Sequence, residues 1–244
     1  MEALFKRFES MKVLSGSTLK LIALFTMMCD HVGSILLSRS ELGMTPFLSI
    51  GSHGLTLYAV SRMIGRIAFP IYCFLITEGF IHTHDRKRYG ISLLIFALIS
   101  EIPWNLEHSG HLTHPTQNVF FTLFLGYLGI CAVEKYKEDT QRLLLSLLAL
   151  FGISLVLRCD YGCRGFALIV LIYVLRDKKV LQAILGSCMV SSAYAAIIAF
   201  IPINLYNGER GFIKGKALKY AFYVAYPLHI FIIYLIRLNT FGYN

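Results

Sequence analysis

Charged residues are scarce in this sequence of 244 residues. Lysine, arginine, aspartate and glutamate make up only 15% of the chain, whereas hydrophobic residues make up 56%. A soluble domain carries about 25% charged residues, so this composition excludes an ordinary soluble fold. Long polar linkers, low-complexity tracts and internal repeats are also missing. We therefore expect one continuous domain, and the missing repeat disfavours transporter folds that are built from paired halves.

The motifs of the common soluble enzyme families are absent as well. The sequence contains no GxGxxG fingerprint, Walker loop, pair of CxxC motifs or GxSxG elbow. The first apolar segment contains Asp30 and His31 and lacks a small-residue cleavage site. We therefore expect this segment to remain as a membrane anchor and not to be removed as a signal peptide.

What the sequence does contain is a series of apolar stretches long enough to cross a bilayer core of about 30 Å. They predict an all-α, polytopic transmembrane helical bundle with about eight spans. The predicted spans are residues 18–38, 57–81, 90–106, 118–134, 142–157, 164–175, 180–205 and 219–238. Residues 18–238 would form a single integral membrane domain between a cytoplasmic N-terminal segment, 1–17, and a cytoplasmic C-terminal tail, 239–244.

The formal charge of +9 is explained by topology and not by nucleic acid, because the basic residues are scattered through the short segments between spans. Basic residues before the first span and after the second, fourth and sixth predict that these segments are cytoplasmic. Both termini would then face the cytoplasm. The basic segment 207–219 does not fit this count, because it would lie outside. Either it is a re-entrant or functional loop, or the span count is off by one.

Many ionisable or polar side chains fall within or beside these spans, where each charge costs about 2.5 to 3.5 kcal/mol on insertion scales. They are Lys20, Asp30, His31, Arg62, Arg66, Glu78, His82, Glu101, Asn118, Asp160 and His229. In the predicted topology Lys20, Glu78 and His82 lie toward the cytoplasm. His31, the two arginines, Glu101, Asn118 and Asp160 lie toward the outer side. A polar cavity that crosses the membrane would use both sets.

His31 is the candidate general base, because imidazole accepts a proton from an amine or hydroxyl near neutral pH. Asp30 immediately precedes His31, so the two side chains point about 100° apart on a regular helix. A carboxylate from another span, Glu101 or Asp160, is therefore the better orienting partner. Arginines deeper in the cavity would suit the phosphates of a bulky anionic donor, and Pro70 is expected to kink the second span between the arginines and Glu78.

Other interpretations of the polar residues remain open. Any one pair of buried charges has about even odds of being purely structural, since ion pairs also fix helix register. His108, His111 and His114 form a conceivable metal site, but no cysteine or carboxylate ligand set accompanies them, so a loop is favoured and no metal is expected. Cys159 and Cys163 flank "DYG", where a local disulfide is possible.

Seven stretches, in this order along the chain, carry a family resemblance. They are "LKLIALFTMMCDHVG", "IGRIAFPIYCFLITEGFIHTHDRKRY", "LISEIPWNL", "QNVFFTLFLGYLG", "DYGCRGFALIVLIYVLR", "LYNGERG" and "YAFYVAYPLHIFIIYLI". Together they resemble the TraX family, whose namesake is associated with N-acetylation of conjugative pilin. The resemblance covers roughly residues 18–238. TraX proteins are similar in turn to the transmembrane acyltransferases, which include heparan-glucosaminide N-acetyltransferase and the polysaccharide O-acyltransferases.

The resemblance implies a bacterial cytoplasmic-membrane acetyltransferase that takes acetyl groups from cytoplasmic acetyl-CoA. The polysaccharide enzymes carry an arginine and a histidine separated by ten residues in their first span, and Lys20 and His31 stand at that spacing here. The acceptor would be an amine or hydroxyl of a pilin, a peptide or a surface glycan. The candidate catalytic residues are His31, Asp30, Glu101 and Asp160. The candidate acetyl-CoA-binding residues are Lys20, Arg62, Arg66, Glu78, His82, Asn118 and His229.

Two other functions compete with acetyl transfer. A transporter or flippase for an anionic or lipid-linked substrate would use the same buried charges as a permeation path. A non-catalytic scaffold for assembly of a surface structure would use them only as structural pairs. The expected partners are acetyl-CoA, the acceptor and membrane lipids, without nucleic acid, and the sequence is compatible with an oligomer.

Overall fold

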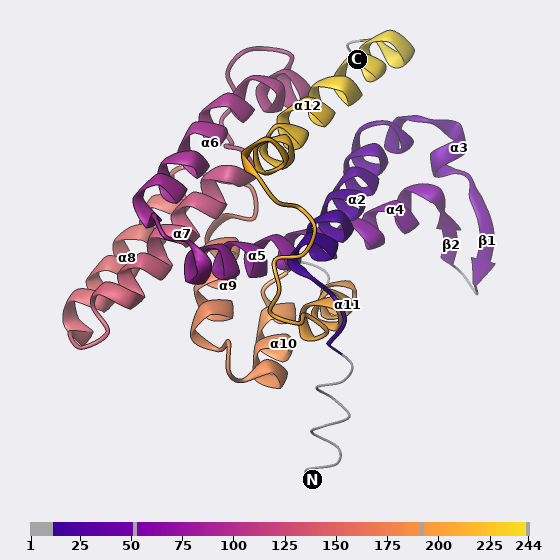
Figure 1. The fold of residues 1–244 in the computed structure, drawn as a ribbon. Helices are drawn as coiled ribbons and strands as arrows, with labels where there is room; N and C mark the ends of the chain where they lie inside the picture. The colour runs from indigo at the N-terminus through magenta and orange to yellow at the C-terminus, as the bar shows by residue number, and fades with distance from the viewer. Residues whose placement is uncertain (1–11, 51–52, 191–192, 243–244) are drawn as a thin grey trace, which may run out of the picture.

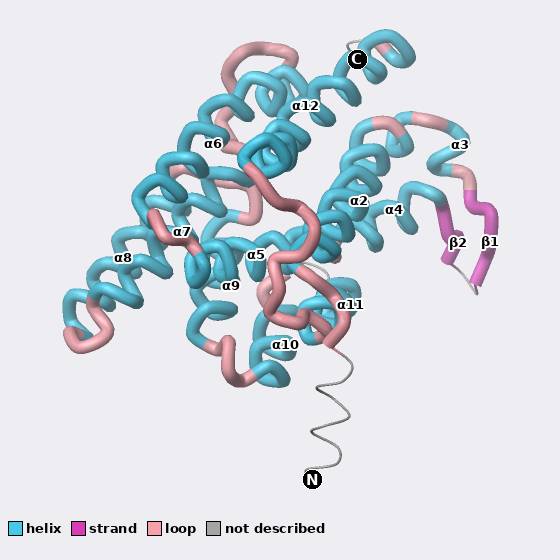
Figure 2. Tube along the Cα trace, viewed as in Figure 1, coloured by secondary structure: helices cyan, strands magenta, loops and turns pink. Residues whose placement is uncertain are grey.

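The computed structural model describes residues 12–50, 53–190 and 193–242 and is almost entirely helical (Figures 1 and 2). The described helices are α2 (Gly16–Ile35), α3 (Glu41–Met44), α4 (Leu57–Gly65), α5 (Ala68–His82), α6 (Arg86–Ser109), α7 (Val119–Lys135), α8 (Thr140–Val156), α9 (Gly162–Val174), α10 (Lys179–Cys188), α11 (Ala193–Asn204) and α12 (Lys216–Phe241). A 3₁₀ turn, η1, covers Leu37–Arg39. Two short antiparallel strands, β1 (Pro46–Ile50) and β2 (His53–Thr56), replace part of the loop that we predicted over 39–56.

The sequence starts these helices with polar capping residues. Ser15, Thr56, Asp85, Asn118 and Asp139 each accept a hydrogen bond from a backbone N–H in the first turn of the helix that follows. Such a cap satisfies a donor that has no partner inside the helix. The predicted helix positions are therefore confirmed to within a few residues at most ends.

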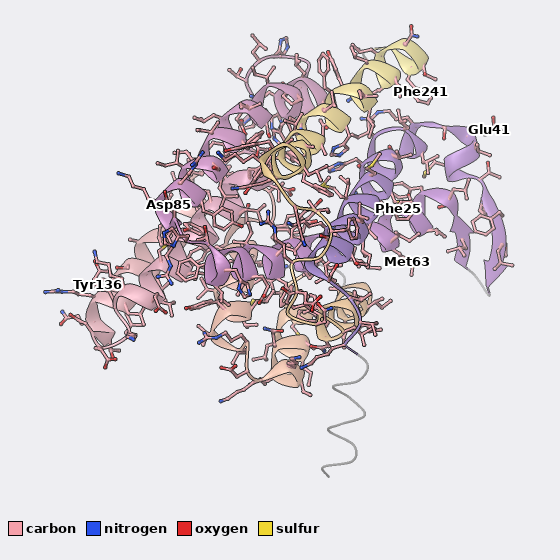
Figure 3. The ribbon with its side chains drawn as sticks, in the orientation of Figure 1. Phe25, Glu41, Met63, Asp85, Tyr136 and Phe241 are labelled. Atoms are coloured by element: carbon pink, nitrogen blue, oxygen red, sulfur yellow. The ribbon has the colours of Figure 1, made fainter. Side chains whose placement is uncertain are left out.

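Four helical segments are long and apolar enough to cross a membrane, judged by length and composition over the described residues. They are Gly16–Arg39, Leu57–His82, Arg86–Ser109 and Lys216–Phe241. Their outward surfaces are apolar, as Phe25 on α2 and Met63 on α4 illustrate (Figure 3). The helical membrane bundle is thus confirmed, whereas the count of eight spans stays a prediction.

The second predicted span is broken before the residue that we expected to kink it. Helix α4 ends at Gly65 and α5 begins at Ala68, so Pro70 lies in the first turn of α5. A proline ring clashes with the carbonyl four residues earlier, here that of Arg66, and lacks an N–H of its own. Pro70 therefore weakens the helix at Arg66, where α4 has ended and α5 has not yet begun.

The seventh predicted span, 180–205, is wrong as a single helix. It folds as two helices, α10 and α11, that pack against each other. The chain after α11 then returns to the start of α2, where Leu14 N–H donates to Leu205 O at 3.0 Å and Ser17 Oγ donates to Arg210 O at 2.8 Å. The basic segment 207–219 therefore begins beside the start of α2.

Helices α10 and α11 also affect where the last helix begins. Helix α12 starts near the beginning of α2, runs along α6, and brings Arg237 to Glu107 at the far end of α6. The described chain therefore starts and ends at opposite ends of the bundle (Figure 1). The prediction that both termini face the cytoplasm stays a prediction. Most of the predicted N-terminal segment, residues 1–11, lies outside the described residues.

Helices α2 and α4 approach closely because Gly65 has no side chain. A Cβ atom at Gly65 would overlap the carboxyl group of Asp30, whereas a Cβ at Gly152 on α8 would meet nothing within 4 Å. We expect Gly65→Ala to lower the free energy of unfolding by about 1 to 3 kcal/mol, the usual cost of overpacking. Gly152→Ala is the matched control and should stabilise the protein by up to about 1 kcal/mol. Unfolding in detergent micelles measures both, and equal effects would contradict this packing.

Candidate functional site

A charged cavity of about 580 Å³ lies between α2, α4, α6, α12 and the segment before α9. Its ionisable lining residues are Asp30, His31, Arg39, Arg62, Arg66, Glu107, His108, Asp160, Arg164 and Arg237. Five of the residues predicted as a site from sequence thus meet around one space: His31, Asp30, Arg62, Arg66 and Asp160. We call this space the charged cavity.

His31 is held by a second histidine from the last helix. His31 Nδ1 lies 2.5 Å from His229 Nε2, and His229 Nδ1 lies 2.7 Å from the carbonyl oxygen of Ala225. A carbonyl only accepts, so the proton of a neutral His229 sits on Nδ1 and its Nε2 accepts from His31. His31 then carries its proton on Nδ1, and its Nε2 is the basic atom of a ring that lines the charged cavity.

The orienting partner that we predicted for His31 is therefore corrected. Glu101 and Asp160 were expected, whereas the structure places His229 in that position. His229 lies 198 residues away in sequence, so no local pattern pairs the two rings. His229 contacts the candidate base, and the prediction that it binds acetyl-CoA stays a prediction.

Asp30 is turned away from His31 and toward α4. Its Oδ2 accepts a hydrogen bond from Arg62 Nη1 at 2.7 Å. A bond between ionised groups in a half-buried place of this kind is stronger than a neutral one. The pair locks α2 to α4 and fixes the helical turn that carries His31.

Asp160 occupies a strained turn between α8 and α9. Arg158 and Tyr161 both have positive φ, at 48° and 62°, which costs a non-glycine residue about 1 kcal/mol or more. Thr122 Oγ1 donates to the carbonyl oxygen of Asp160, and the ring of Tyr161 stacks on Phe69 at 3.6 Å between centroids. These contacts hold the Asp160 carboxyl against the charged cavity, and burial raises its pKa to about 6.

An ion-pair cluster lines one end of the charged cavity. Arg237 Nη1 lies 3.3 Å from Glu107 Oε1, and His108 Nδ1 lies 2.8 Å from Glu107 Oε2. The Glu107 and Arg237 side chains are only 9% and 13% exposed. The cluster therefore ties the end of α12 to the end of α6.

A second cavity, also of about 580 Å³, opens at the other end of the bundle. It contains Lys20, Glu78 and His82, which we predicted to lie together, and adds Arg210 and Lys219. Its aromatic lining residues are Tyr72, Tyr89, Phe120, Tyr206, Phe222, Tyr223 and Tyr226. The ammonium of Lys219 lies 5.9 Å from the ring centres of both Tyr89 and Tyr223. We call this space the aromatic cavity.

The two cavities meet at one wall. Met27, Tyr72, Val119 and Tyr226 line both of them. Tyr226 also packs edge-on against the two histidines, with ring centroids 6.1 Å from His31 and 5.7 Å from His229. The candidate base therefore lies next to a residue, Tyr226, that lines both cavities.

Three predicted site residues, Glu101, Asn118 and His229, line neither cavity, and His229 instead contacts His31 as described above. The backbone N–H of Asn118 donates to Glu101 Oε1 at 2.9 Å, and its side-chain amide donates to the same oxygen. The side-chain amide also donates to Ala97 O at 2.8 Å. Asn118 Oδ1 accepts from the N–H of Phe120 and so caps α7. These bonds use the polar atoms of Asn118 within the junction of α6 and α7. The structure therefore places the Glu101–Asn118 pair as a helix-to-helix tie and not as part of the cavity walls.

Comparison with known proteins shows the family of the chain. The sequence model of a family described as "TraX protein" matches residues 15–237. The chain belongs to the TraX family. It is also 29% identical, over 88% of its own length and 93% of the relative's length, to "Probable fimbrial assembly protein FimC, serogroup H1" of Dichelobacter nodosus. No solved structure matches it significantly.

Sequence reasoning missed several lining residues of this TraX protein. Arg237 lies inside a predicted span and carried the same signal as Arg62, namely a charge at membrane depth. Arg164 and Glu107 lie at helix ends, where charges are common, so no sequence signal separated them from ordinary boundary residues. Only the fold brings them to the charged cavity.

The structure of this TraX protein also places the histidines and cysteines that we considered. His108 binds Glu107, and His114 Nδ1 lies 2.8 Å from Thr116 Oγ1. Within the described ranges, no group of three or more His, Cys, Asp or Glu side chains is arranged to hold a metal ion. Cys159 and Cys163 are both free thiols, so the local disulfide is not formed.

Proposed function

We propose that this TraX protein is an integral membrane acetyltransferase. Acetyl-CoA would occupy the aromatic cavity, and the acceptor would occupy the charged cavity. The observation that carries the proposal is the position of His31: a ring lining one cavity, oriented by His229, beside the wall that the two cavities share. An acetyl group presented at Tyr226 from one side would meet a nucleophile held by His31 on the other.

In the proposed reaction, the acceptor's nitrogen or oxygen attacks the carbonyl carbon of the thioester. His31 Nε2 takes the acceptor's proton, and the positive charge that develops on the ring is shared through the hydrogen bond to His229. The bond between carbon and sulfur then breaks, and the proton passes to the departing sulfur, so that the products are the acetylated acceptor and CoA thiol. Arg62, fixed by Asp30, places positive charge near the oxyanion of the intermediate.

The aromatic cavity suits the donor's chemistry. Lys20, Arg210 and Lys219 supply positive charge for the phosphates, and tyrosine rings supply flat surfaces for an adenine base. Glu78 is its lone carboxylate, because the other ionisable lining residues are basic or tyrosine. An excess of basic groups in a narrow space raises the local concentration of an anion such as acetyl-CoA.

We assign the aromatic cavity to the cytoplasmic side of a bacterial cytoplasmic membrane, because acetyl-CoA is a cytoplasmic metabolite. The charged cavity would then open outward, toward an amine or hydroxyl of a pilin, a peptide or a surface glycan. The similarity to a protein named for fimbrial assembly supports an acceptor that belongs to a surface structure.

Donor binding can be tested without knowing the acceptor. A ligand that binds only the folded state at 100 times its Kd stabilises that state by about 2.7 kcal/mol. We expect acetyl-CoA to raise the Tm of the detergent-solubilised protein, and Lys219→Gln to reduce this rise. Lys137→Gln, an exposed change outside both cavities, is the control and should keep the full rise. Absence of a rise in the unmodified protein, or equal loss in both variants, would remove the proposed donor site.

A carrier is the competing function, because two cavities at opposite ends of a bundle also suit alternating access. Counterflow of a labelled anion in liposomes without acetyl-CoA would support the carrier. Transfer of a labelled acetyl group that depends on His31 would support the enzyme. A pure assembly scaffold would show neither activity.

A further inference from the structure

The charged cavity has more arginine than carboxylate. Its arginines are Arg39, Arg62, Arg66, Arg164 and Arg237, and its carboxylates are Asp30, Glu107 and Asp160. Guanidinium groups are always protonated near neutral pH. An unmatched guanidinium is costly where it is partly buried in a membrane protein, as Arg62, Arg66 and Arg237 are. Arg39 and Arg164 are exposed, so their guanidinium groups are accessible.

Three of the five arginines are engaged by the protein itself. Arg62 pairs with Asp30 and Arg237 pairs with Glu107. Arg39 donates to the carbonyl oxygen of Ile35 at 2.9 Å, where the last turn of α2 leaves carbonyls without partners. These three side chains hold the walls together.

Arg66 and Arg164 are the remaining two. Over the described part of the chain, neither guanidinium makes an ion pair within 4 Å or a side-chain hydrogen bond. Arg66 lies just after α4 and Arg164 lies in the first turn of α9, so they reach the cavity from different elements. His31 lines the same cavity. The two groups thus offer planar, bidentate donors to a ligand beside the candidate base.

Asp160 does not neutralise this pair. Its Oδ1 accepts the N–H of Tyr161 at 3.0 Å, and no basic group forms an ion pair with it within 4 Å among the described residues. One carboxylate against two guanidiniums still leaves net positive charge for a ligand.

We propose that Arg66 and Arg164 bind an anionic group, a phosphate or a carboxylate, that the acceptor carries close to its reacting amine or hydroxyl. The identification of the ligand as the acceptor rests on the proposed function, whereas the anion site itself does not depend on it. The anion would hold the acceptor so that its nucleophile meets His31 Nε2, which converts a bimolecular encounter into a positioned one. A neutral amine or hydroxyl of the same size would bind weakly and be a poor substrate.

The direct test compares O-phosphoethanolamine with ethanolamine as binding probes, at constant ionic strength, in a neutral maltoside detergent. We expect the phosphorylated amine to stabilise the protein and ethanolamine not to. Arg66→Gln and Arg164→Gln should each raise its Kd about tenfold, the loss of one charge-assisted contact. Arg142→Gln, on α8 outside both cavities, is the control. Arg164 is exposed, so its variant should fold even if the Arg66 variant does not.

Lys219→Gln separates the two cavities. If the phosphorylated amine sits in the charged cavity, Lys219→Gln leaves its binding unchanged. If binding is lost in Lys219→Gln and kept in the Arg66 and Arg164 variants, the probe occupies the aromatic cavity and the proposal is overturned. Equal binding of ethanolamine and its phosphate would also overturn it.

A lipid phosphate could supply the same chemistry, so the source is tested separately. If the site serves an acceptor, the soluble probe should still bind in phosphatidylglycerol nanodiscs, as it does in phosphatidylcholine nanodiscs. Complete competition by phosphatidylglycerol would assign the site to a lipid headgroup and overturn the acceptor role. If acetyl transfer fails but the probe still binds and its binding depends on the two arginines, the proposed enzyme activity is rejected and the anion site is kept.

Discussion

Replacing His31 by glutamine should lower kcat for acetyl transfer by about 10²- to 10⁴-fold, the usual contribution of a positioned general base. The physical reason is that glutamine keeps a polar side chain of similar reach but cannot take the proton of the acceptor. Acetyl-CoA binding should be unchanged, because His31 lines the charged cavity and not the aromatic one. Single-turnover transfer of labelled acetyl, with the Tm rise as a binding control, measures both effects.

His229 gives the same prediction a second readout. His229→Phe removes the acceptor of the His31 Nδ1 proton, so the ring loses its fixed tautomer and kcat should fall with little change in KM for the donor. His229→Gln offers a carbonyl oxygen and should recover part of the rate. His111→Gln, on an exposed loop outside both cavities, should have no effect. Full activity in the His31 variant would end the catalytic assignment.

The second large effect concerns stability. Arg237→Met should lower the free energy of unfolding by about 3 kcal/mol, because removing one partner leaves the other charge buried and uncompensated. Glu107 would keep His108 but lose the arginine that donates to both its carbonyl and its carboxylate. Unfolding in mixed detergent micelles measures the loss.

Two variants define what that loss means. Arg176→Met breaks an exposed pair with Asp177 whose atoms are 4.0 Å apart, and it should cost no more than about 1 kcal/mol. The double variant Arg237→Met with Glu107→Gln should be less destabilised than the sum of the two single changes, because the double change leaves neither partner of this pair as an isolated charge. Strict additivity would show that the two side chains do not interact.

Much of the fold follows from local sequence. Apolar length located most helices, and caps such as Asp85 and Asn118 fixed where they begin. The failure at 180–205 has a physical cause: the composition is apolar throughout, so hydropathy alone cannot distinguish one long span from two short helices that turn back. That single ambiguity also leaves the number of spans open.

The sequence could predict several of the residues that line the charged cavity, but not which of them contact one another. Charge at membrane depth identified His31, Arg62, Arg66 and Asp160, because lipid makes such residues expensive anywhere else. The same signal also selected Glu101, whose charge is used to hold Asn118. The partner of His31 comes from the last helix, and contacts over that sequence distance are set by packing, which a single sequence does not encode locally.

The proposed transfer requires that the two cavities open at opposite faces of the membrane and meet at the wall of Met27, Tyr72, Val119 and Tyr226. Labelling with a membrane-impermeant maleimide tests it directly, on Ser34→Cys in the charged cavity and Thr83→Cys in the aromatic cavity, each in a cysteine-free background. We predict that the two positions react only from opposite sides of the membrane, and that acetyl-CoA protects Thr83→Cys alone. Reaction of both cysteines from the same side would contradict the claim.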